Sequence, residues 1–266
     1  MIEKYKLALL FLPKEESAIK LEIYNKLTEL TGVNQKSIEL WLAVAEGDAS
    51  KVQELINAGV DLDNVPFITT TPLIQAVIKG DVAMVRLISE KADINKADND
   101  ENQASPLYYS LGYEDQPVNM KIVELLLANG ADVNKPMYDG NTPMHMTHYK
   151  GNKEAIKLLL QYGAEINAKN DEDKTPLHCL LKQPDVGSET KLDIIKEFHG
   201  MYDVTAQDKD GKTVIDYAKE HCPELLSLFS DNVVESSNSS ITNTITSDNI
   251  DIDIPTLGDS NSHPEC

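Results

Sequence analysis

The chain has 266 residues, of which 41% are apolar and 26% are charged, so most of it can bury a core. Aromatic residues make up only 6%, which suits a core packed from aliphatic side chains. With 24 basic and 44 acidic residues, the formal net charge is −20. A surface this acidic repels phosphate groups, which argues against nucleic-acid binding and against adhesion to anionic membranes.

Signals of compartment are few. The cysteines Cys179, Cys222 and Cys266 are odd in number and show no paired spacing, which predicts thiols in a reducing compartment. The early apolar run at residues 7–12 is too short for a secretory signal. No stretch approaches the roughly 20 residues of a membrane span. We therefore expect a cytoplasmic protein without membrane insertion.

In chain order, the first element is a helix-like stretch at about residues 15–30, which ends before Gly32. We interpret residues 1–31 as an N-terminal helical cap.

A four-residue motif then recurs along the chain. It reads TPMH at 142–145 and TPLH at 175–178, which are 33 residues apart, and the same register catches TPLI at 71–74 and SPLY at 105–108. Thr or Ser before Pro supplies an oxygen that caps a helix, and Pro suits the first helical position. Each copy continues with an apolar run, and most then have a glycine-containing terminator such as NGADVN at 129–134, although the second copy, with EKADIN at 90–95, lacks the glycine. Each copy is therefore predicted to form two helices followed by a turn.

Several such copies in one register closely resemble the ankyrin repeat, over about residues 32–230. The resemblance implies an all-α solenoid of helix-turn-helix units with finger loops, in which neighbours stack because one helix pair cannot bury its apolar face alone. We count five full copies and a closing half. The first copy is degenerate around Ile38, and the later copies start at Thr71, Ser105, Thr142, Thr175 and Thr213.

Residues 231–266 have a different composition, with seven acidic residues, no Lys or Arg, and abundant Ser, Asn and Thr. Such a segment cannot bury enough apolar surface to offset the entropy of ordering, so we predict a disordered acidic tail. Within it, residues 250–255 read IDIDIP. This run could add an edge strand to a partner's sheet, or it is simply an apolar patch in the tail.

Two copies are longer than the period. The third gains four residues between its helices, within 112–119, and two in its finger at 96–104, and the fifth gains about six within 182–189. Both inter-helix insertions are polar, so we expect exposed loops. Tolerated length variation and contact with a partner both fit these insertions.

The family's concave face, made by the fingers and the outer positions of the first helices, is the implied partner-binding surface. Tyrosine and methionine side chains on such a face are typical interface anchors, although some of these rings could instead pack between helices. The candidate partner-binding residues are Phe67, Tyr109, Tyr113, Met137, Tyr138, Met146 and Tyr149.

The sequence motifs that would indicate catalysis or ligand binding are incomplete. DGKT at 210–213 ends like a phosphate-binding loop, but Ala206 stands where that loop needs glycine. His145 and His178 occupy the fourth motif position, where the family's histidine hydrogen-bonds neighbouring backbone, and His148 stands where a small residue is usual. No Ser-His-Asp order, HExxH or GxGxxG is present. We expect no enzyme, no cofactor and no metal.

The leading hypothesis is thus a monomeric, non-enzymatic protein-protein interaction module whose partner carries a basic patch. The chain also resembles the ankyrin-repeat effectors that bacteria deliver into host cells by type IV secretion, with the tail as the delivery signal. Alternatively, residues 12–23 are faintly similar to the opening of an F-box, which implies an adaptor that recruits a target to a ubiquitin ligase.

Overall fold

The computed structural model describes residues 22–229 except 24, 27, 31, 33–34, 64–69, 100–101 and 113–116. The helical cap predicted at residues 1–31 lies largely outside the described residues, and the acidic tail at 231–266 lies entirely outside them. Both therefore stay predictions.

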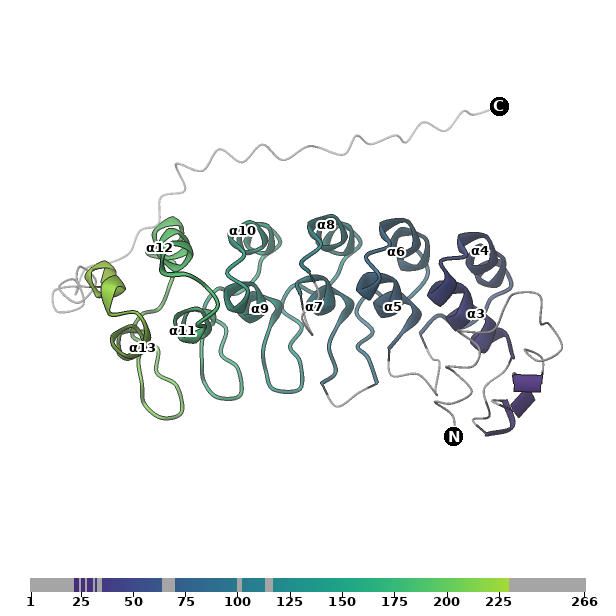
Figure 1. The fold of residues 1–266 in the computed structure, drawn as a ribbon, viewed down its shortest axis with the longest axis horizontal. Helices are drawn as coiled ribbons and strands as arrows, with labels where there is room; N and C mark the ends of the chain where they lie inside the picture. The colour runs from purple at the N-terminus through teal and green to yellow at the C-terminus, as the bar shows by residue number, and fades with distance from the viewer. Residues whose placement is uncertain are drawn as a thin grey trace, which may run out of the picture.

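The described helices stack in two layers, with the loops between repeats projecting on one side as fingers (Figure 1). The first helix of each repeat lies in one layer: α3 (Gln35–Glu46), α5 (Pro72–Ile78), α7 (Pro106–Ser110), α9 (Pro143–Tyr149), α11 (Pro176–Lys182) and α13 (Val214–His221). The second helices form the other layer: α4 (Ala49–Asn57), α6 (Val82–Ser89), α8 (Met120–Ala128), α10 (Lys153–Gln161), α12 (Ser188–Glu197) and the short 3-10 helix η2 (Pro223–Phe229). The all-α solenoid is confirmed.

The motif positions act as the sequence predicts. The five residues Thr71, Ser105, Thr142, Thr175 and Thr213 are the N-caps of their helices, each in an extended conformation. At the other end of the repeat, Gly130 and Gly163 follow the second helices with φ of +86° and +84°. Glycine adopts this left-handed backbone without the steric cost of a Cβ atom, so the chain can turn sharply into the finger.

The core is continuous along the stack because each repeat buries side chains from both of its helices. Fully buried residues of the first helices include Ile74, Leu107 and Met144, and those of the second helices include Ile88 and Leu126. Each layer of these side chains packs against the next repeat, so stability depends on neighbours rather than on any one helix pair.

A row of asparagines fixes the spacing between fingers. Asn134 accepts a hydrogen bond from Glu165 N at 3.0 Å and donates one from Nδ2 to Gly163 O at 3.1 Å. Asn95 and Asn167 make the same pair of contacts one repeat before and one repeat after. Each finger is therefore tied to the next through backbone groups, which holds the fingers in a regular array.

The insertion in the fifth copy is only partly an exposed loop. Pro184 and Asp185 are exposed, but Gln183 and Val186 are buried, so the expected exposure is wrong for these two. A Cβ atom on Gly151 would lie 2.8 Å from Val186 Cγ1, which shows how closely the insertion packs on the preceding repeat. In the third copy, residues 113–116 lie outside the described residues.

Candidate functional site

The histidines of the motif organise the first helices of the fourth and fifth repeats. His145 Nδ1 accepts a hydrogen bond from Thr142 N at 3.1 Å, which places its proton on Nε2, 2.9 Å from Lys174 O in the next finger. His178 Nδ1 accepts from Thr175 N in the same way. Burial lowers the pKa of both histidines, so they remain neutral caps. Their predicted structural role is confirmed.

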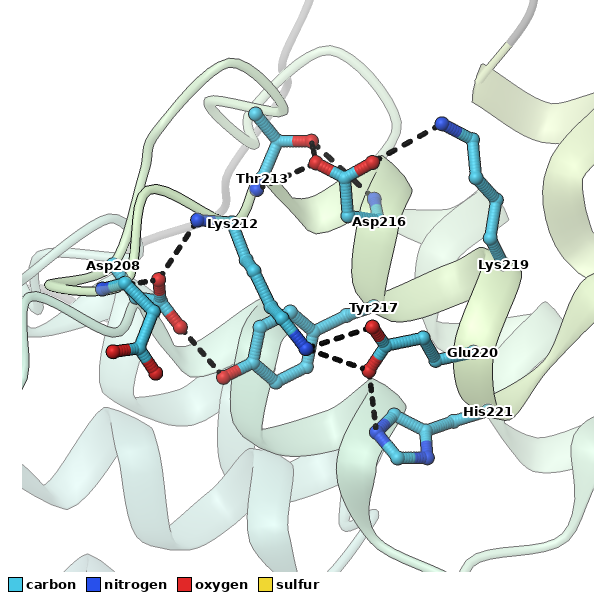
Figure 2. Close-up of polar contacts among 9 residues, drawn as sticks. Asp208, Lys212, Thr213, Asp216, Tyr217, Lys219, Glu220 and His221 are labelled. Carbon is cyan, nitrogen blue, oxygen red and sulfur yellow. Dashed lines mark hydrogen bonds and ion pairs between the residues drawn. The ribbon is translucent and has the colours of Figure 1, made fainter.

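Two repeats hold their fingers against their first helix with a tyrosine-aspartate pair. In the third repeat, Tyr109 donates to Asp98 Oδ2 at 2.6 Å, and both side chains are buried. In the last repeat, Tyr217 donates to Asp208 Oδ2 at 2.7 Å (Figure 2). Asp208 Oδ1 also accepts from the backbone N–H of Lys212 at 2.9 Å, so the DGKT segment is a turn stabilised from within.

Burial opposes ionisation of Asp208, but the hydrogen bonds from Tyr217 and from the turn outweigh it and lower the pKa of the carboxyl. The pKa of the Tyr217 phenol is raised by burial and by its bond to this carboxylate. The pair therefore consists of a phenol donor and a charged acceptor, which is stronger than a neutral hydrogen bond.

The fourth and fifth repeats lack this pair. Backbone geometry identifies the equivalent finger positions, because Asp98, Met137, Asn170 and Asp208 each donate their N–H to the carbonyl just before the N-cap residue. Four residues after the N-cap, where the other two repeats carry tyrosine, stand Met146 in the fourth repeat and Cys179 in the fifth. Smaller or more flexible side chains thus occupy the space that a phenol ring and its carboxylate fill elsewhere.

Two adjacent pockets open at these positions. The first, of about 310 Å³, is lined by Tyr108, Met137, His145, Met146, Tyr149 and Lys150, among others. The second, of about 300 Å³, includes Asn170, Glu172, Lys174, His178, Lys182 and Gln183. They share Asn141, Tyr149 and Cys179, so the Tyr149 side chain contributes to both. We call the two pockets together the central groove.

Charges around the central groove are unevenly engaged. The Asp139 carboxylate accepts from Asn141 N at 3.0 Å and from Asn141 Nδ2 at 2.6 Å, and Glu172 pairs with Lys174. The hydrogen bond from Lys174 lowers the pKa of Glu172. Lys150 Nζ lies 5.9 Å from the centre of the Tyr149 ring, and Lys182 is exposed. Within the described part of the chain, neither Lys150 nor Lys182 forms an ion pair.

The structure places the predicted partner-binding residues in three environments. Tyr138 and Tyr149 are 59% and 48% exposed. Met137 and Met146 are mostly buried but line the first pocket. Tyr109 is buried and bonded to Asp98, so in this conformation it holds the finger. Phe67 and Tyr113 lie outside the described residues.

Sequence reasoning missed the two residues that, together with Tyr149, line both pockets of the central groove: Asn141 and Cys179. Their signal was present, because Cys179 has the same register position as Met146, and Asn141 directly precedes the N-cap Thr142. The tyrosine-aspartate pairs also had a signal: tyrosine recurs four residues after the N-cap at positions 109 and 217.

The groove offers little reactive chemistry. Burial raises the pKa of the Cys179 thiol to about 12, so the nucleophilic thiolate is scarce at neutral pH. Across the residues that the structure describes, no three His, Cys, Asp or Glu side chains gather as a metal site would require. In the same part of the chain, no helix is long and apolar enough to span a bilayer.

His148 is fully buried, unlike an ordinary histidine. Its Nδ1 lies 3.0 Å from Met144 O, which can only accept, so the proton is on Nδ1 and Nε2 accepts from the Tyr202 hydroxyl at 2.9 Å. Burial lowers the pKa of His148 to about 3. Tyr202, which is half-buried, follows α12, so this polar pair links the fourth repeat to the end of the fifth.

Comparison with known proteins agrees with this architecture. The family model for ankyrin repeats (3 copies) matches residues 40–137 and 116–190. Among curated proteins, the chain is similar to "Ankyrin repeat, SAM and basic leucine zipper domain-containing protein 1" of Carollia perspicillata, with 31% identity over 131 residues, 49% of this chain and 27% of that protein. The protein of the same name from Dasypus novemcinctus is 30% identical over 109 residues, 41% of this chain and 23% of its own length.

The chain therefore spans about a quarter of the length of these relatives. Because the family model covers more than half of the chain and the helices stack in the same register, the chain belongs to the ankyrin-repeat family.

Proposed function

We propose that this protein is a non-enzymatic interaction module that binds a partner protein through its concave face and finger loops, centred on the central groove. The observation that carries the proposal is the exposed Tyr149 ring between two pockets, with Tyr138 exposed on the finger that leads into the same helix. Tyrosine beside a methionine-lined pocket is a common arrangement for an interface anchor. The partner inserts a bulky apolar side chain beside Met137 and Met146.

Charge supports a partner with a basic patch. The chain carries a net charge of −20, and the tip of the fifth finger exposes Asp171 and Glu172. Basic groups on the partner opposite these fingers would speed association and make it sensitive to salt. We propose a monomer in the cytoplasm, which multi-angle light scattering and cell fractionation would test.

The test is affinity capture with the full chain, followed by binding measurements with the captured protein. Tyr138→Ala/Tyr149→Ala should weaken binding at least tenfold, because interface tyrosines often contribute more than 1.4 kcal/mol each. The matched control is Tyr162→Ala, which removes a tyrosine that is 46% exposed at the end of α10, outside the groove residues. Equal loss in both variants, or none in the double variant, would remove the central groove from the proposal. Circular dichroism checks that each variant is folded.

Two more specific roles rest on sequence alone. Delivery into a host cell depends on residues 231–266, and fusion of that segment to a reporter tests it directly. Recruitment of a ubiquitin ligase depends on the N-terminal segment, and capture of a ligase scaffold by the full chain, lost when Leu12 becomes Asp, tests that role. Both segments lie wholly or largely outside the described residues, so neither role enters the proposal.

A further inference from the structure

The central groove differs in charge from the chain as a whole. Three lysines line its two pockets, Lys150, Lys174 and Lys182, against two carboxylates, Asp139 and Glu172. Among the described residues Lys174 pairs with Glu172, whereas Lys150 and Lys182 form no ion pair. The groove therefore offers apolar surface and uncommitted positive charge in a protein whose net charge is −20. Its best complement is an apolar segment that carries carboxylates.

The chain itself contains such a segment. Residues 250–254 read Ile-Asp-Ile-Asp-Ile, inside a 36-residue stretch with seven acidic residues and no Lys or Arg. In an extended conformation, alternate side chains point to opposite sides, so the isoleucines can face the pockets while the long lysine side chains reach the aspartates.

Chain length permits the contact. The described residues end at Phe229, 21 residues before Ile250. That many residues reach about 70 Å when extended. From α13 to α9 is two helix-to-helix steps of about 10 Å each. A linker of this length gives an effective concentration in the millimolar range, so even a weak contact would be populated.

We propose that residues 250–254 bind the central groove of the same molecule and compete with the partner. Only the competition with the partner rests on the proposed function, because the intramolecular contact can be measured without any partner. Displacing the segment would increase the apparent affinity for the partner by the reciprocal of the fraction of molecules with an open groove.

Methyl NMR of the full chain tests the contact, because Met137 and Met146 line the first pocket. The variant Ile250→Ser/Ile252→Ser/Ile254→Ser keeps the tail charge and should shift both methyl resonances. Met84, buried in α6, should not move, and serves as the internal reference.

The matched control is Ile241→Ser/Ile245→Ser, which removes two isoleucines from the same tail outside the alternating run. A shift seen only with the triple variant and unchanged over a tenfold dilution supports the proposal. No shift, an equal shift in the control, or a shift that disappears on dilution because the segment comes from a second copy, would each overturn it. None of these outcomes alters the effect expected of Tyr138→Ala/Tyr149→Ala on partner capture, so failure of this contact and failure of the proposed function are distinguishable.

Discussion

The buried His148 makes the solenoid sensitive to mild acid. In the folded chain its pKa is about 3, against 6.5 for a free histidine. Between these values the unfolded chain binds a proton that the folded chain does not, so stability falls as the pH drops below 6.5. Each pH unit between these two pKa values removes about 1.4 kcal/mol from the free energy of unfolding. Lowering the pH from 8 to 5 crosses about 1.5 units of this range and should therefore remove about 2 kcal/mol.

The test is the double variant His148→Leu/Tyr202→Phe. Leucine occupies the same register position in the third and fifth repeats, as Leu111 and Leu181, so it suits the site. Tyr202→Phe is included because the Tyr202 hydroxyl would otherwise lose its acceptor in a half-buried site. Urea unfolding at pH 8 and pH 5, followed by far-UV circular dichroism, gives the change for each protein.

The expected result is a pH-dependent loss that is about 2 kcal/mol smaller in the double variant than in the parent chain. His145 and His178 also have lowered pKa values, but they are unchanged in both proteins and so cancel in the comparison. Tyr202→Phe alone keeps the buried imidazole and should retain the acid sensitivity. Equal pH dependence in the parent and the double variant would refute the reasoning.

Four further variants test the local structure and the central groove. Gly140→Ala and Gly211→Ala should each cost about 1–2 kcal/mol, because both positions have φ near +77°. Gly140→Ala should cost more, since its Cβ would lie 2.6 Å from the backbone of the next finger whereas nothing lies within 4 Å of the other; equal Tm values would argue against that finger contact. Tyr109→Phe should destabilise by about 1–3 kcal/mol in urea unfolding, because it leaves a buried carboxylate short of a donor, and a neutral effect would mean that water replaces the phenol. Met137→Asp/Met146→Tyr should install the tyrosine-aspartate pair in the fourth repeat and abolish partner capture without unfolding the chain; retained capture would place the partner elsewhere.

The architecture was readable from sequence because its determinants are local. A capping residue, a proline and a glycine at fixed spacing specify where each helix begins and ends, and these positions recur in one register. Which side chains are exposed on the concave face was harder to predict from sequence, because burial there depends on contacts between the finger and the helix. The register placed Tyr109 on the concave face, yet its ring is buried and its hydroxyl donates to Asp98 in the finger.

The same limit explains His148 and the fifth insertion. Sequence showed that a large polar residue stood at a core position, but its acceptor role became clear only with Tyr202, which is 54 residues away in the chain. The sequence of the fifth insertion is mostly polar, which predicted exposure. Its buried apolar side chain, Val186, packs where Gly151 of the previous repeat has no side chain. Contacts between repeats, rather than within them, are what the sequence pattern leaves open.

The position of the central groove follows from this division between repeated and variable residues. Every repeat needs its caps and core, so those positions cannot vary without loss of stability. The residue four places after the N-cap is free to differ: where it is tyrosine paired with aspartate, the finger closes against the helix, and where it is Met146 or Cys179, a pocket remains. The two pocket-forming repeats are neighbours, flanked on each side by a repeat with the pair. The solenoid thus combines a stable frame with a stretch in which side chains can change without unfolding the array, and this is the stretch where we place the proposed partner contact.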